Sequence, residues 1–183
     1  DNTPTEDTLF TRLAPDGTIE PGFGRNPAYS PSTDEALDVA LQADGKLVLL
    51  VAARSTYADI LVVRLNADGS LDASFGSHGI VRSDVGPLDD YARAVAVQRD
   101  GKIIVAAQVS NPLPVPPSFA LLRYASDGAP DAGFGSGGVL HVPFFGGNES
   151  ANDLIVQPDG RIVAAGSWRT GLTTDIAMVR LVP

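Results

Sequence analysis

The most regular chemistry in this sequence comes from arginines that are followed by an acid eight positions later. The pairs are Arg12 with Glu20, Arg64 with Asp72, and Arg123 with Asp131. A turn at the Asp-Gly between the two partners would bring guanidinium and carboxylate together as a charge-assisted hydrogen-bonded pair. Because the pair recurs at a fixed separation, we predict that it is a structural ion pair and not a catalytic site.

Other acids occupy matching positions at the start of, or inside, predicted strands. Asp34, Asp90 and Glu149 align at successive separations of 56 and 59 residues, and could ring the mouth of a channel and bind calcium. Asp38 and Asp153 align within the same strands, where a carboxylate must be exposed or paired, and could bind a polar ligand. The alternative is that the first three are solvated turn acids. No other cofactor is expected.

Two aromatic residues adjoin the segments in which the sequence varies most. Tyr57 and Trp168 could form a surface for a sugar or a peptide, although Trp168 could equally fill the core. The two histidines, His78 and His141, lie at unrelated positions and have no recurring Ser or Asp at triad spacing. We therefore assign no catalytic residue, and an enzymatic activity is uncertain and the less favoured interpretation.

Composition excludes several classes of partner and site. The chain has 183 residues, a formal net charge of −9 and no cysteine. Without cysteine there are no disulfides and no thiolate metal sites. The net negative charge without a Lys/Arg cluster argues against nucleic acid, because phosphates need cationic contacts. No apolar stretch approaches the roughly 20 residues of a membrane-spanning helix, so no membrane insertion is expected.

These residues belong to a repeat that must position them. Gln42, Gln98 and Gln157 each end an alternating apolar segment, and each is followed by Asp-Gly two residues later. Asp-Gly readily supplies the positive φ that a tight hairpin needs. Apolar runs at 36–42 and 46–53, with two more at 60–65 and about 79–85, complete one unit. Helical spacing is almost absent, so each unit is predicted to be a four-stranded antiparallel meander.

Four-stranded meanders at this period are typical of β-propeller blades. The strings Asp68-Gly69…Asp72…Phe75-Gly76 and Gln98-Arg-Asp-Gly-Lys102 resemble the delta-60 repeat, a β-propeller-type module of bacterial proteins. The resemblance covers residues 8–182 and implies the propeller fold, but no activity and no catalytic residue. We predict an all-β, propeller-like array in a single repeat domain, 1–183. Its parts are a partial blade at 7–33, blades at 34–89 and 90–148, and a partial blade at 149–183.

Length variation within the repeat is confined to one loop of each unit, at 54–59, 110–118 and 169–175. Variable loops on a constant scaffold are where binding usually resides, although a tolerated surface insertion is the alternative. The function predicted is a non-catalytic binding or scaffolding module for a protein or glycan partner. The alternative is a carbohydrate hydrolase in which Asp38 and Asp153 act as general acid and base.

About three blades are too few for a ring, since propellers typically have 4 to 8. We expect a homodimer in which residues 151–182 of one copy are completed by the N-terminal segment of the other. Arg180, which has no acid after it, would find one there. An open fan or a piece of a longer array are the alternatives. The lack of cysteine, low lysine content and polar start suggest a secreted, periplasmic or cell-surface bacterial protein whose signal peptide has been removed.

Overall fold

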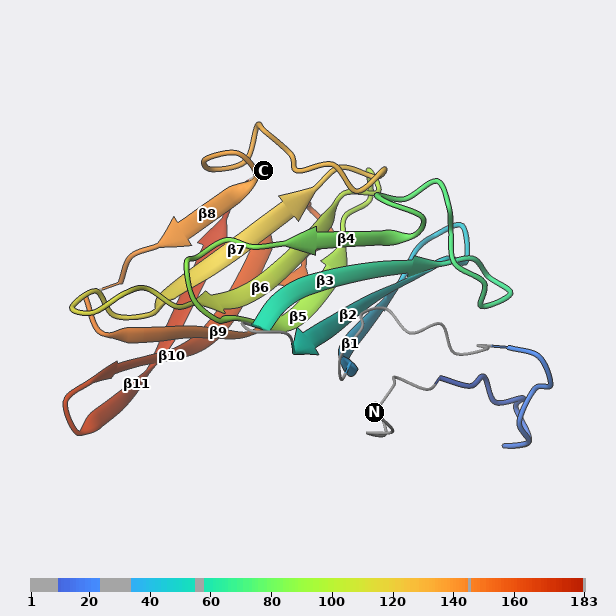
Figure 1. The fold of residues 1–183 in the computed structure, drawn as a ribbon, viewed down its shortest axis with the longest axis horizontal. Helices are drawn as coiled ribbons and strands as arrows, with labels where there is room; N and C mark the ends of the chain where they lie inside the picture. Colours follow the sequence, from blue (N-terminus) through green and yellow to red (C-terminus); the bar gives the residue numbers. More distant parts are fainter. Residues whose placement is uncertain (1–9, 24–33, 55–57, 145, 183) are drawn as a thin grey trace, which may run out of the picture.

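The computed structural model describes residues 10–23, 34–54, 58–144 and 146–182, and this part of the chain forms three antiparallel sheets and no helix (Figure 1). We call the sheets blades 1, 2 and 3. Blade 1 contains β1 (Asp34–Leu41), β2 (Leu47–Arg54), β3 (Ala58–Leu65) and β4 (Ile80–Ser83). Blade 2 contains β5 (Asp90–Val97), β6 (Ile103–Val109), β7 (Ser118–Tyr124) and β8 (Val139–Val142). Blade 3 contains β9 (Asn148–Val156), β10 (Ile162–Thr170) and β11 (Thr173–Leu181). The predicted all-β, propeller-like array is thereby confirmed; closure by a dimer stays a prediction.

Within each blade the strands follow one another in sequence order, as a meander requires. The Asp-Gly hairpins work as predicted, since Gly45, Gly101 and Gly160 have φ values of 85°, 82° and 85°. β6 is apolar on both faces because blade 1 covers one face and blade 3 the other. Strands covered on both faces have near-continuous runs of Val, Ile and Leu or Ala rather than a clean alternation.

The blades stack face to face and bury two apolar layers. One layer joins blades 1 and 2 and includes Leu50, Ile60 and Val105. The second joins blades 2 and 3 and includes Phe119 and Ile162. The first strands of the blades, β1, β5 and β9, are neighbours in the stack, with β5 in the middle. A third cluster covers the outer side of blade 1, where Phe10 packs against it.

Residues 10–23 repeat the turn that follows the third strand of a blade. The bridge between Leu13 and Ile19 matches those between Leu65 and Leu71 and between Tyr124 and Pro130. This segment therefore belongs to a partial blade that precedes blade 1. Blade 3 shows no fourth strand in the described residues, which leaves the outer edge of β11 unpaired there.

The two ends of the stack of strands differ in character. We call the end that carries the β1–β2 and β3–β4 turns and their equivalents the turn end, at the top and right of Figure 1. The opposite end, at the left, carries the β6–β7 loop (110–117) and the β10–β11 turn (171–172), and we call it the loop end. In the part of the chain that the structure describes, no helix is long and apolar enough to cross a membrane.

Candidate functional site: the blade clamp and the loop end

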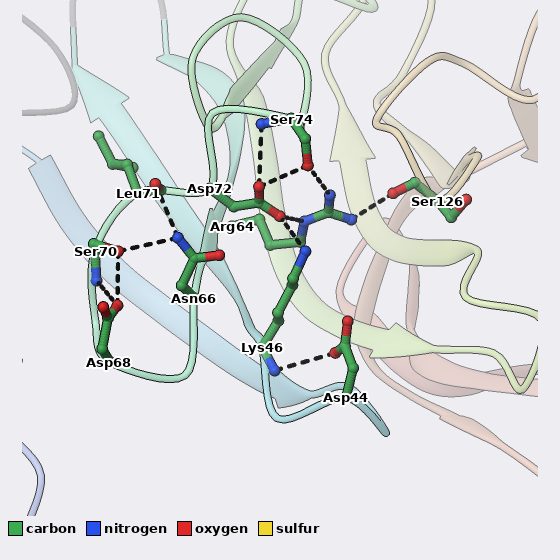
Figure 2. Close-up of polar contacts among 10 residues, drawn as sticks. All are labelled: Asp44, Lys46, Arg64, Asn66, Asp68, Ser70, Leu71, Asp72, Ser74 and Ser126. Atoms are coloured by element: carbon green, nitrogen blue, oxygen red, sulfur yellow. Dashed lines mark hydrogen bonds and ion pairs between the residues drawn. The ribbon is translucent and has the colours of Figure 1, made fainter.

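Arg12, Arg64 and Arg123 are each joined to the acid eight residues later, at the turn end. The Nε of Arg64 lies 2.8 Å from Oδ2 of Asp72, and that of Arg123 lies 2.7 Å from Oδ2 of Asp131 (Figure 2 shows the first). Arg12 forms the same pair with Glu20. A backbone hydrogen bond from the acid to the arginine carbonyl, 2.9 Å in blades 1 and 2, brings the partners opposite each other.

Two further contacts complete the sites of Arg64 and Arg123 within their blades. The guanidinium of Arg64 stacks 4.5 Å from the ring centre of Phe75, a cation–π contact that Arg123 repeats with Phe134 at 4.4 Å. A lysine from the first hairpin also reaches the acid. Lys46 Nζ lies 2.7 Å from Asp72 Oδ2. The recurring Phe-Gly and Asp-Gly-Lys motifs therefore serve the same buried cluster.

The carboxylate of Asp72 is the anionic centre of this cluster. Its Oδ1 accepts hydrogen bonds from the Ser74 backbone at 3.1 Å and hydroxyl at 2.6 Å, and the side chains of Arg64 and Asp72 are each 7% exposed. Burial alone raises the pKa of Asp72. The hydrogen bonds from Lys46 and Ser74 and the charge of Arg64 outweigh burial, so this pKa lies well below its usual range.

The same arginine also reaches the next blade. The Nη1 of Arg64 donates to the carbonyl of Ser126, in the turn after β7, as the Nη1 of Arg12 donates to the carbonyl of Ala67 at 3.0 Å. Both acceptors stand three residues after the next arginine of the repeat. We call the arginine, its acid, its phenylalanine and this carbonyl the blade clamp.

A backbone contact beside the clamp adds to the connection between blades 1 and 2. Gly76 N–H donates to the carbonyl of Asp127 at 2.8 Å. A Cβ on Gly128 would lie 2.7 Å from a Val81 methyl and 2.9 Å from the Phe75 ring. Only glycine allows Phe75-Gly76 of one blade to approach the second Asp-Gly turn of the next so closely.

Asp90 and Glu149 hold the connections between blades. Asp90 Oδ2 accepts backbone hydrogen bonds from Val85 at 2.7 Å and Gly86 at 3.2 Å, and Glu149 Oε1 accepts one from Phe144 at 3.0 Å. Both residues are buried rather than solvated. Burial raises the pKa of Asp90, and its two backbone hydrogen bonds offset this only in part.

The predicted calcium set is thus split between two separate loops. No group of three or more His, Asp or Glu side chains suited to a metal is found among the described residues. The side chain of Asp34 lies outside the described part. Calcium binding by these acids stays a prediction.

Asp38 and Asp153 lie at a β-bulge in the first strand of their blades, where the pairing register shifts. Asp38 Oδ2 accepts the backbone N–H of Val95 in the next blade at 2.8 Å. Asp153 Oδ1 accepts the N–H of its own neighbour Leu154 at 2.8 Å. Because β5 stands between β1 and β9, the two acids belong to blades that do not adjoin. The hydrolase interpretation stays a prediction.

Trp168 lies in β10 opposite Glu149 and Asp175 and is half-buried. A Cβ on Gly147 would approach its Nε1 to 2.6 Å, so the missing side chain of that glycine makes room for the indole. Tyr57 lies outside the described residues. His141 is exposed in β8, with its Nδ1 3.1 Å from the hydroxyl of Ser118.

The loop end presents two nearly bare leucines. Leu113 in the β6–β7 loop is 95% exposed, and Leu172 in the β10–β11 turn is 98% exposed. The β6–β7 loop is held at both of its ends. Ser110 N–H donates to Asp89 O at 3.2 Å, and Pro117 O accepts the N–H of Glu149, in blade 3, at 3.1 Å.

Inside the β6–β7 loop, Asn111 Nδ2 donates to Pro116 O at 2.9 Å, and Val115 N–H donates to Pro112 O at 3.0 Å. Proline also restricts φ along this segment. The loop is therefore pre-organised and presents its apolar tip in a defined place.

The family model described as domain of unknown function (DUF5122) beta-propeller matches residues 42–75, 98–134 and 157–183, together more than half of the chain. The chain belongs to this β-propeller family. No curated protein matches the chain.

The three matches to the β-propeller family follow the clamp closely. Each begins at a glutamine, and the first two end at the clamp phenylalanines Phe75 and Phe134, so that Arg64, Asp72 and Phe75 all fall inside the first match. The third contains Arg180, the last arginine of the series. The β6–β7 loop, whose length differs from that of its equivalents in the other blades, also lies inside the second match. The family model therefore spans the variable loop as well as the constant strands.

Sequence reasoning missed the carbonyl acceptor of the blade clamp and the lysine that contacts the clamp acid. The acceptors Ala67 O and Ser126 O are backbone atoms, which any residue type supplies, so residue identity carries no signal for them. Lys46 and Lys102 did carry a signal, because a cation follows Asp-Gly in each unit. Lys102 Nζ lies 3.1 Å from Asp131 Oδ2, repeating the contact of Lys46.

Proposed function

We propose that this chain is a non-catalytic binding module that holds a protein partner on its loop end. The observation that carries the proposal is the near-complete exposure of Leu113 and Leu172 at the tips of two connections at the same end of the molecule. Exposed large apolar side chains gain free energy when a partner covers them. A loop already fixed by hydrogen bonds loses little conformational entropy on binding.

A protein partner fits this surface better than a glycan. Sugars stack on exposed aromatic faces, whereas the tips here are aliphatic and Trp168 is half-buried over Gly147. The clamp pairs and the acids Asp90 and Glu149 are already engaged within the fold. Binding through loops on a rigid scaffold is consistent with aliphatic side chains at the loop tips and with charged side chains that serve the fold.

The test is selection of a phage-displayed random-peptide library on the wild-type chain. Selected peptides should lose at least tenfold in affinity for the double variant Leu113→Ser/Leu172→Ser. They should bind normally to the control Ile19→Ser, which removes an exposed apolar side chain from the turn that is equivalent to the β3–β4 connection. Equal binding to the double variant, or selective binding on a glycan array with no peptide selected, would overturn the proposal.

A further inference from the structure

Blade 3 has an apolar face that points away from blade 2. Its strands alternate, so that Ala164 and Ala177 are buried against blade 2 while their neighbours point outward. On the outward face Ile176 is 87% exposed and Met178 is 65% exposed, and Ile155, on the same face of β9, is also exposed. We call this surface the open face of blade 3.

The repeat shows what kind of surface covers these positions. Counting from the clamp arginine, Ile176 is equivalent to Ile60 and Phe119, and both of those are 0% exposed. In the same way Met178 is equivalent to Val62 and Leu121, which are also fully buried. In blades 1 and 2 these side chains are covered by the next blade. The open face of blade 3 therefore has the side-chain pattern of a surface on which another blade sits.

The opposite end of the array carries the matching surface. Val39 and Leu41 in β1 are 55% and 71% exposed. The equivalents of Val39 are Val95 and Leu154, which are buried against the preceding blade. Val39 also lines an apolar groove of about 580 Å³, together with Leu47, Leu49 and Leu65 of blade 1 and with residues 10–13. We call the surface formed by Val39, Leu41 and this groove the leading face of blade 1.

We propose that a second copy of this chain covers the open face of blade 3 with the leading face of its blade 1. This head-to-tail contact repeats the arrangement that joins blades 1 and 2, in which apolar side chains from both blades form one buried layer. Two such contacts related by a twofold axis close a ring of about six blades, within the usual range of 4 to 8.

The contact has a defined consequence for the partial blade at residues 10–23. β11 and residues 10–13 both correspond to the third strand of a blade, so β11 of one copy takes the position that residues 10–13 of the other hold. Arg180 then replaces Arg12 and donates to the Ala67 carbonyl of the second copy. The Arg12–Glu20 pair that is lost is solvent-exposed, and exposed ion pairs stabilise little.

The experiment measures molar mass by light scattering at micromolar concentrations. The wild type should have twice the mass of one chain. Ile176→Asp/Met178→Asp breaks the open face and Val39→Asp/Leu41→Asp breaks the leading face, so each variant should be monomeric. An equimolar mixture of the two should recover a 1:1 dimer, because each variant retains one intact face.

The control is Leu172→Asp, which adds charge at the loop end and should leave the dimer intact even though it weakens peptide binding there. Should circular dichroism show that an aspartate variant has lost its sheet structure, Ile176→Thr/Met178→Thr replaces it, since threonine favours strands. A monomeric wild type, a dimer that the folded face variants retain, or a mixture that stays monomeric would each overturn the proposal.

Discussion

The guanidinium of Arg64 donates to the backbone carbonyl of Ser126, which lies in the next blade. The same side chain pairs with Asp72 in its own blade. One residue therefore stabilises both the internal contacts of blade 1 and its packing on blade 2. An interface between repeats is thereby built from a motif that looks purely local in the sequence.

Replacing Arg64 by lysine should lower the free energy of unfolding by about 1.5–3 kcal/mol, because lysine cannot keep both the ion pair with Asp72 and the hydrogen bond to the Ser126 carbonyl. Urea denaturation measures the change. The matched control is Arg12→Lys, which alters the same set of contacts in a side chain that is 49% exposed. It should cost about 0–1 kcal/mol. Equal losses for the two variants would contradict a role for burial.

The stabilising effect of Asp72 should depend on pH. Its pKa in the folded protein lies below that of the unfolded chain, about 3.9, so the folded state favours the ionised form. The stabilisation is fully present above that value and is lost as the pH falls below it. The gap in unfolding free energy between the wild type and Asp72→Asn should therefore be widest near neutral pH.

Unfolding curves at several pH values between 7 and 3 measure this gap. Asp44→Asn, in the first hairpin of the same blade, serves as the control for removing one negative charge. A gap that stays constant down to pH 3 would show that Asp72 does not act through its charge.

Gly128→Ala should destabilise the contact between blades 1 and 2. Its φ of +92° costs an alanine about 1 kcal/mol, and the clash with Val81 and Phe75 adds about 1–3 kcal/mol of overpacking. Gly45→Ala has a similar φ of +85°, but its Cβ would meet only Ala67 at an ordinary 3.5 Å. Thermal denaturation should show a clearly lower melting temperature for Gly128→Ala, and similar values would argue against the close approach.

Asp38→Ala should lower stability by about 1–3 kcal/mol, because it leaves the buried N–H of Val95 without an acceptor. Asp153→Ala, which affects only the N–H of Leu154, should cost about 0.5 kcal/mol or less.

The same variants address the hydrolase alternative. If the wild type cleaved chromogenic glycosides and both variants were folded but inactive, these acids would have a catalytic role.

The strands and their order were predictable from the sequence because strand formation depends on local alternation and turn chemistry. The Asp-Gly hairpins and the four-strand period needed no tertiary information. The acidic partner of each clamp arginine was also predictable from the sequence, since an eight-residue hairpin spacing places Arg64 opposite Asp72.

The candidate acids show where such reasoning stops. Asp90 and Glu149 align in the repeat, and this alignment predicts one set at the mouth of a channel, whereas each accepts a backbone hydrogen bond in its own loop. Alignment in a repeat places residues at equivalent positions of different blades. It does not bring them to one point, because successive blades are separated by the thickness of the apolar layer between them.

The sequence by itself determined the repeat, the strands and the residue types of the clamp, because these depend on short-range spacing. Only the tertiary structure decided that Arg64 reaches Ser126, that Asp38 reaches Val95, and that Ile176 stays uncovered while Ile60 is buried. Ile60 and Ile176 are the same residue type at the same position of the repeat. Their difference in exposure comes from whether another blade lies against them, which is a property of the stack and not of the unit.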